Sequence, residues 1–263
     1  MTRLLHELRL FCMALQFLTR LPVPRGVGFA PAMFRRAVRH FPLVGALVGA
    51  VGALVALGAL QLWPAAVAAT LAVASTLWLT VALHEDGLAD TFDALLGAAT
   101  RDKALAIMKD SRLGSYGVAT LATSLLLRVV LLAELLGRGA LAAVAAWVAA
   151  HAAGRALAVA LMWSLPYAGD AAQAKAPALT RDVASGDAAW ATLVGVLVIA
   201  LAATVQPAAA GRFAAAIAAL VLLLLLLRRW LQRRLNGYTG DTLGAAEQLG
   251  EVAVLLAFVA QWP

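Results

Sequence analysis

The sequence has little charge and almost no cysteine. Only 13% of its 263 residues are charged, while 63% are hydrophobic, which is too little charge for the surface of a soluble domain. Cys12 is the only cysteine, so an intrachain disulfide and a cysteine-based metal site are excluded. The sequence also lacks a cluster of basic and aromatic residues suited to nucleic acid. The net charge of +7 is therefore assigned to topology and to the lipid surface.

Long apolar runs fill most of the chain. Several approach or exceed ~18 residues, the length of a membrane-spanning helix. We predict an all-α, polytopic integral membrane bundle of about seven transmembrane helices, built as a single membrane-embedded catalytic domain over residues 1–263. The predicted spans are 41–62, 65–83, 116–136, 139–165, 189–206, 212–228 and 243–262.

Two further patterns concern helix packing. Leu4, Leu8, Phe11, Leu15 and Leu18 fall at helical spacing before the first span. They predict an N-terminal amphipathic helix, which either lies in the membrane interface or packs against the bundle. Within the first span, small residues recur at helical spacing, which indicates close approach of a neighbouring helix. These small residues are Gly45, Gly49 and Gly52 with their neighbouring alanines.

The basic residues are distributed unevenly. Most of the 21 lysines and arginines precede the first span or fall in three long connections. Only Arg138 and Arg212 fall on the opposite side. The positive-inside rule therefore predicts a multi-pass protein of the cell (inner) membrane whose active site faces the cytoplasm. The three long connections are 84–115, 166–188 and 229–242.

A cluster of acids, "HEDGLADTFDALL", follows an uncharged apolar run. Asp86, Asp90 and Asp93 are spaced i, i+4, i+7, so on a helix they share one face. Three like charges on one face need compensation, and Mg²⁺ prefers such oxygen ligands. Glu85 points about 100° away from Asp86 on a helix, toward a second ion or a substrate hydroxyl. The alternative is a solvated helix face.

A basic stretch and a glycine-rich stretch add candidate anion ligands. Lys109, Asp110 and Arg112 lie in "IMKDSRLGSYG", where arginine could grip a phosphate or merely set topology. In "LNGYTGDTLGAAEQ" the backbone N–H groups could face an anion, and Asp241 could bind a metal. A plain turn is the alternative reading of this stretch.

Three ionisable residues fall inside predicted spans: Arg128, His151 and Arg155. Such residues usually face the bundle interior or a wet cavity. A structural ion pair or snorkelling toward the interface is the competing interpretation.

Together these blocks resemble the cobalamin synthase family of adenosylcobinamide-GDP ribazoletransferases. The likeness covers nearly the whole chain, and the acidic block followed by "IMKDSRLGSYG" is its most specific part. "GYTGDTLGA" is a looser match. The matching segments are "FLTRLPVP" at 17–24, "FPLVGALVG" at 41–49, "HEDGLADTFDAL" at 84–95, "IMKDSRLGSYG" at 107–117, "SLPYA" at 164–168 and "GYTGDTLGA" at 237–245.

The resemblance implies a Mg²⁺-dependent phosphoryl transfer that completes the nucleotide loop of coenzyme B12. A hydroxyl of α-ribazole, or of its 5′-phosphate, attacks the corrinoid-linked phosphate of adenosylcobinamide-GDP, and GMP leaves. The implied catalytic and metal-binding residues are Asp86, Asp90 and Asp93, with Glu85 as a further ligand or as the base. The implied substrate and phosphate ligands are Lys109, Asp110, Arg112, Arg155 and Asp241.

Other partners and rival functions follow from the same residues. The expected partners are the corrinoid, the ribazole and the lipid bilayer, without nucleic acid; the oligomeric state stays open, a homo-oligomer included. A CDP-alcohol phosphotransferase of phospholipid synthesis would carry an Asp-Gly-x-x-Ala-Arg core, but here Asp90 follows Ala89. A membrane transporter would place its polar residues near the midplane, which fits Arg128, His151 and Arg155 but not the acid cluster.

Overall fold

The computed structural model describes residues 3–28, 30–169, 180 and 182–261. Within them the regular structure is helical, apart from an isolated bridge between Tyr167 and Tyr238. The elements are α1 (Arg3–Leu18), α2 (Pro31–Ala37), a 3₁₀ turn (Val38–His40), α3 (Phe41–Ala59), α4 (Ala65–Thr80), α5 (Leu83–Gly97), α6 (Arg101–Ile107), α7 (Ser115–Arg138), α8 (Ala140–Ser164), α9 (Ser185–Thr204), α10 (Ala209–Leu235) and α11 (Gly240–Val259).

Among the described residues, six helices are long and apolar enough to cross a membrane: α7 to α11, and the continuous helix Met33–Ala59 that contains α3. The pair α4 and α5 passes the same test only when it is taken together, and it is bent by 89°. The predicted all-α polytopic bundle of about seven spans is confirmed by these helices.

Several predicted boundaries differ from the observed ones by a few residues, and two of them lie next to the acid cluster and the glycine-rich stretch. The span predicted at 65–83 ends at Thr80. The connection predicted at 229–242 shrinks to 236–239, because α10 continues to Leu235. Leucine and arginine are good helix formers, so the arginines at its end do not stop the helix. Asn236 stops it, in the left-handed conformation (φ 59°) that asparagine tolerates better than most residues.

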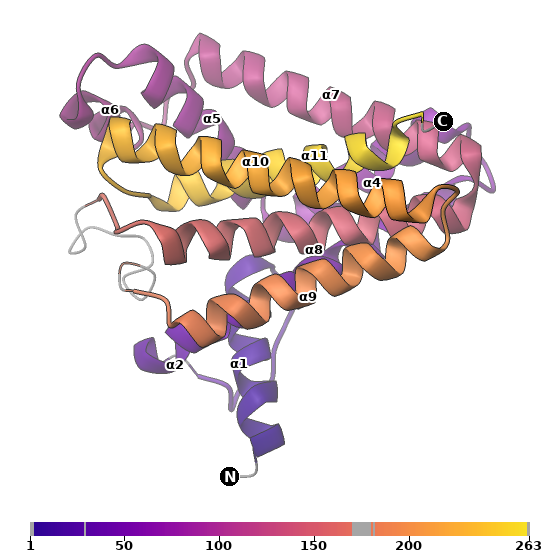
Figure 1. Ribbon diagram of the computed structural model, residues 1–263, viewed down its shortest axis with the longest axis horizontal. Coiled ribbons are helices and arrows are strands. Elements are labelled where there is room, and N and C mark those ends of the chain that lie inside the picture. Colours follow the sequence, from indigo (N-terminus) through magenta and orange to yellow (C-terminus); the bar gives the residue numbers. More distant parts are fainter. Residues whose placement is uncertain (1–2, 29, 170–179, 181, 262–263) are drawn as a thin grey trace.

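Helix α8 lies at the centre of the bundle, with α3, α9 and α11 packed against it (Figure 1). Alanine and glycine keep these axes close. A Cβ added at Gly49 would lie 2.9 Å from the Cα of Val148, closer than such atoms normally approach. The close helix packing predicted for the first span is therefore confirmed, and it occurs against α8.

Helix α1 projects from the bundle toward the N-terminus (Figure 1). Its second half buries Leu10, Met13 and Leu18, whereas Leu4 and Leu8 near its start are 69% and 50% exposed. The interpretation that this helix packs against the bundle is therefore confirmed for its second half. The second half packs on the bundle, and the first half presents leucines that suit a membrane interface.

Three connections meet at one end of the molecule, here called the loop-rich end: residues 98–114, 165–169 and 236–239. Arg101 joins them, because its guanidinium donates to the carbonyl oxygens of Leu235 (2.8 Å) and Ala168 (2.6 Å). Arg233 and Arg234 lie in the last turn of α10, at this end, while Arg138 ends α7 at the other. Lys175 and Arg181, the basic residues of the predicted connection 166–188, lie outside the described residues.

Candidate functional site

The acidic helix α5 is set by a sharp bend after α4. Val81 (φ 59°) and Ala82 (φ 53°) both adopt the left-handed conformation, and the N–H of Ala82 donates to the carbonyl oxygen of Leu77 at 2.9 Å. For residues other than glycine this conformation costs about 1–2 kcal/mol each, and valine is β-branched. The two strained residues turn α5 away from the axis of α4 and lay it against α7 and α11.

The predicted acid row is present on α5, and its exposure falls along the helix. Asp86 is exposed, Asp90 half-buried and Asp93 buried. The two carboxylate oxygens of Asp93 accept the N–H groups of Gly114 (2.7 Å) and Gly117 (2.8 Å). Gly114 is the N-cap of α7 and has no side chain to cap it, so Asp93 satisfies these N–H groups from a neighbouring helix. Asp93 thereby connects the acidic helix α5 to the "SRLGSYG" segment at the start of α7 through hydrogen bonds.

Two glycine contacts bring α11 to the same helix. A Cβ at Gly87 would lie 2.7 Å from the carbonyl oxygen of Asp241, and a Cβ at Gly244 would lie 3.0 Å from that of His84. The backbones therefore touch where side chains would keep them apart. This contact places half-buried Asp241 beside the first turn of α5.

The glycine-rich stretch before α11 forms a backbone bridge to residues 166–168 and caps the start of α11. The N–H of Tyr238 donates to the carbonyl oxygen of Pro166 at 2.9 Å. Thr239 then caps α11 through a capping box with Thr242. Burial raises the pKa of the Tyr238 hydroxyl, which is not exposed as a proton donor. The structure thus favours the turn interpretation for 237–239 and leaves Asp241 as the residue of this stretch nearest α5.

The basic stretch lies on the surface of the loop-rich end. Lys109 and Arg112 are exposed, and Asp110 is half-buried. The guanidinium of Arg112 donates to both carboxylate oxygens of Asp110, at 3.0 Å and 2.5 Å. These bonds lower the pKa of Asp110 to about 2. At neutral pH Asp110 is therefore ionised. It orients the guanidinium of Arg112 and does not serve as a proton donor.

A buried ionic network lies behind the acid row. Arg128 on α7 donates to Glu85 (2.9 Å) and Gln248 (3.0 Å) and forms an ion pair with Glu251 (2.9 Å). Gln248 in turn donates to Glu85 at 3.0 Å. All four side chains are at most 5% exposed. Glu85 therefore faces the bundle interior, away from the exposed end of the row.

The network continues through α8. Arg155 forms ion pairs with Glu247 (2.5 Å) and Glu251 (3.2 Å), and His151 Nδ1 lies 2.5 Å from Glu251. The interpretation of Arg155 as a structural ion pair is favoured over a phosphate ligand. Sequence reasoning did not assign Glu247, Gln248 and Glu251 a role. The available signal was two acids at i, i+4 within an apolar span, matched by His151 and Arg155 at the same spacing.

His151, Glu247 and Glu251 also form the one group of metal-ligand type found among the described residues. A guanidinium nitrogen of Arg155 already lies within ion-pair distance of both glutamates. A dication added here would meet this charge and that of Arg128 in a dry interior. The charges are better explained as a structural ion-pair network, here called the ion-pair lock, that joins α5, α7, α8 and α11. Its residues are Glu85, Arg128, His151, Arg155, Glu247 and Glu251.

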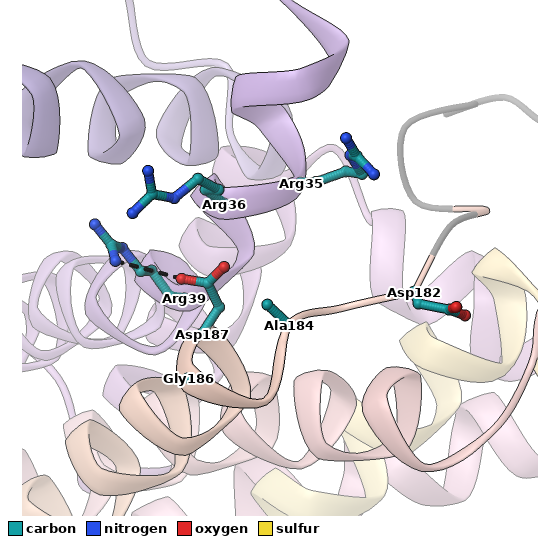
Figure 2. Close-up of a pocket in the computed structure, with 7 residues that line it drawn as sticks. All are labelled: Arg35, Arg36, Arg39, Asp182, Ala184, Gly186 and Asp187. Carbon is teal, nitrogen blue, oxygen red and sulfur yellow. Dashed lines mark hydrogen bonds and ion pairs between the residues drawn. The ribbon is translucent and has the colours of Figure 1, made fainter.

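Cavities formed by the described residues open on the surface, and two of them bear on the site. One, of about 560 Å³, is lined by Arg35, Arg36 and Arg39, by the start of α9 and by Asp182 (Figure 2). In it Arg39 turns toward Asp187, to which it donates at 3.3 Å. The other cavity, of about 520 Å³, is lined by Asp86, by the α4–α5 bend and by the end of α1. Sequence reasoning gave a site role to Asp86 alone among these residues, because only the fold brings the others together.

The fold defines a polytopic helical membrane protein, and its candidate site is the row of carboxylates on α5. The chain belongs to the cobalamin-5-phosphate synthase family, whose model matches residues 10–259.

Curated relatives extend over nearly the whole chain. A protein of Leptothrix cholodnii is 50% identical over 261 residues, which is 99% of this chain and 98% of the relative. Proteins of Ralstonia nicotianae and Shewanella amazonensis are 43% and 38% identical, with at least 97% of each chain covered. All three bear the name adenosylcobinamide-GDP ribazoletransferase. No solved structure matches this chain.

Proposed function

We propose that the protein is an adenosylcobinamide-GDP ribazoletransferase that acts at the cytoplasmic face of the cell inner membrane. The observation that supports this most is the meeting of three motif blocks around α5. Asp93 binds the backbone of Gly114 and Gly117, and Gly87 touches Asp241. Segments more than a hundred residues apart in the sequence thus present carboxylates and cations at one end of the bundle.

The reaction is a phosphoryl transfer. A hydroxyl oxygen of α-ribazole, or of its 5′-phosphate, forms a bond to the corrinoid-linked phosphorus of adenosylcobinamide-GDP. The bond from that phosphorus to the bridging oxygen of the diphosphate breaks, GMP leaves with that oxygen, and the hydroxyl proton passes to a base or to water. Such transfers depend on alignment and on neutralisation of charge, with little covalent chemistry by the protein.

The exposed part of the acid row fits a magnesium ion. Asp86 and Asp90 offer carboxylate oxygens one turn apart on the accessible side of α5, and Asp241 lies beside the same turn. When bound, Mg²⁺ would neutralise phosphate oxygens during the transfer. Asp93 holds two N–H groups and is assigned to positioning α7 against α5, a revision of its expected role as a ligand.

The remaining roles follow from exposure. Lys109 and Arg112 are exposed cations of the segment that Asp93 joins to α5, suited to the diphosphate of the donor. Glu85 and Arg155 lie in the ion-pair lock, and we assign them to holding the helices that carry the site. The distribution of basic residues supports a cytoplasmic orientation.

The test is an assay of GMP release by the purified protein. Adenosylcobinamide-GDP, α-ribazole and Mg²⁺ should together give GMP, and omission of the ribazole or chelation of the metal should abolish release. CDP-diacylglycerol with an alcohol acceptor serves as the control for the rival phosphotransferase reaction. Release of CMP in that control, without GMP in the main assay, would contradict the proposal.

A further inference from the structure

The cavity beside Asp86 lies where the end of α1 meets the α4–α5 bend. Its walls include Gln16 and Phe17 of α1 and Val81 and Ala82 of the bend. Its volume of about 520 Å³ falls within the range of about 300–1,000 Å³ that is typical of small-molecule sites. Asp86 is its one charged lining residue, so the cavity opens onto the acid row.

Some polar side chains of this cavity already make hydrogen bonds within the protein, and others do not. The hydroxyl of Thr19 donates to the carbonyl oxygen of Leu15 at 2.8 Å, and that of Thr80 to the carbonyl oxygen of Thr76 at 3.0 Å. Within the described part of the chain, no side-chain hydrogen bond is recorded for Gln16 or Asp86. An amide that donates and accepts, in the same cavity as a carboxylate that accepts, suits the hydroxyls of a sugar.

The apolar wall of the cavity is fixed in place. The ring of Phe17 packs against Phe34 and Phe41, with centroid distances of 5.0 Å and 6.0 Å. A ring held in this way gives a heteroaromatic base a flat surface to pack on.

The floor of the cavity is the strained bend. A valine at φ 59° followed by an alanine at φ 53° is a rare backbone arrangement, and such strain concentrates at ligand sites. Here it turns the chain so that Asp86 faces the cavity rather than continuing the line of α4.

We infer that this cavity binds the acceptor, a riboside with a neutral heteroaromatic base. The base packs on Phe17, and the sugar lies between Gln16 and Asp86. This inference rests on the proposed function and names the substrate that enters beside Asp86. The cavity of Figure 2 is lined by three arginines and no aromatic residue, so it does not offer the same surface to a base.

The experiment changes Gln16, which is exposed on α1, and measures KM for both substrates of GMP release. Gln16→Leu removes the amide and should raise KM for α-ribazole about threefold to tenfold, the effect of one lost hydrogen bond. Gln16→Trp fills the cavity and should raise it more, with KM for adenosylcobinamide-GDP unchanged. Leu8→Trp is the matched control, an exposed position on the same helix outside the cavity.

A second readout needs no turnover. Added α-ribazole alone should raise the melting temperature of the wild type and of Leu8→Trp, and raise it less in Gln16→Trp. Unchanged KM for α-ribazole in Gln16→Trp, or a rise confined to the donor, overturns the assignment while the proposed function stands. Failure of the wild type to release GMP at all overturns the proposed function, and the inference with it.

Discussion

Asp90 and Asp93 lie on the same face of α5, yet their surroundings separate their roles. Asp93 is buried and satisfies two N–H groups at the start of α7. Asp90 is half-exposed, in the middle of the row. A change that removes the charge of Asp93 therefore disturbs a helix start, whereas Asp90 is the more accessible of the two carboxylates to a bound ion.

Asp90→Asn keeps the shape of the side chain and removes one charge. GMP release should fall by about two orders of magnitude or more, since one electrostatic group commonly contributes about 3 kcal/mol to such a transition state. The melting temperature in detergent, measured alongside, separates a loss of catalysis from a loss of folding. Asp102→Asn, at an exposed acid of α6, is the control and should keep full activity. Turnover near wild type in Asp90→Asn would make the row a solvated helix face.

Arg155 can be tested against its two interpretations. If Arg155 belongs to the ion-pair lock, Arg155→Ala leaves two buried glutamates without one of their partners. The free energy of unfolding should then fall by about 3–5 kcal/mol. Arg155→Lys restores a charge and should recover much of that loss, with KM unchanged for both substrates. A raised KM in Arg155→Lys at unchanged melting temperature would instead support phosphate binding, because only the fork geometry of arginine is lost.

At the scale of elements, the bend between α4 and α5 determines where the acids point. Ala82→Gly should stabilise the protein by about 0.5–1 kcal/mol, because glycine adopts the left-handed conformation without the penalty that alanine bears. Ala119→Gly, at an exposed position within α7, should destabilise it by a similar amount. The two melting temperatures, measured in the same detergent, should therefore move in opposite directions. A lower melting temperature for Ala82→Gly would show that the bend is not strained.

The sequence predicted the helices well, because long apolar runs between basic connections are a strong local signal. It also predicted that Asp86, Asp90 and Asp93 share a helix face, since that follows from spacing alone. It did not predict the bend, because Val81 and Ala82 are ordinary helix residues whose conformation depends on tertiary contacts. Nor did it pair Arg155 with Glu247 and Glu251, since partners 92 and 96 residues away are defined only by the packing of α8 on α11.

At the scale of the whole molecule, the loop-rich end should face the cytoplasm. In a Cys12→Ser background, Ser111→Cys should resist a membrane-impermeant thiol reagent added to intact cells and react once the cells are permeabilised. Ala140→Cys, exposed at the start of α8 near the opposite end, should react from outside. The reverse pattern of labelling would invert the topology and remove the site from the cytoplasm.

The shortness of α4 has a consequence for the bilayer itself. Its 16 residues reach about 24 Å at about 1.5 Å per residue, less than the hydrocarbon thickness of about 30 Å. Because the chain turns aside at Val81, a bilayer next to this helix would have to thin to match it. The acid face would then begin below the level of the surrounding membrane surface. Under the proposed function, the nucleoside and the corrinoid would meet there in a recess bordered by lipid headgroups, and the bilayer would itself form part of the binding site.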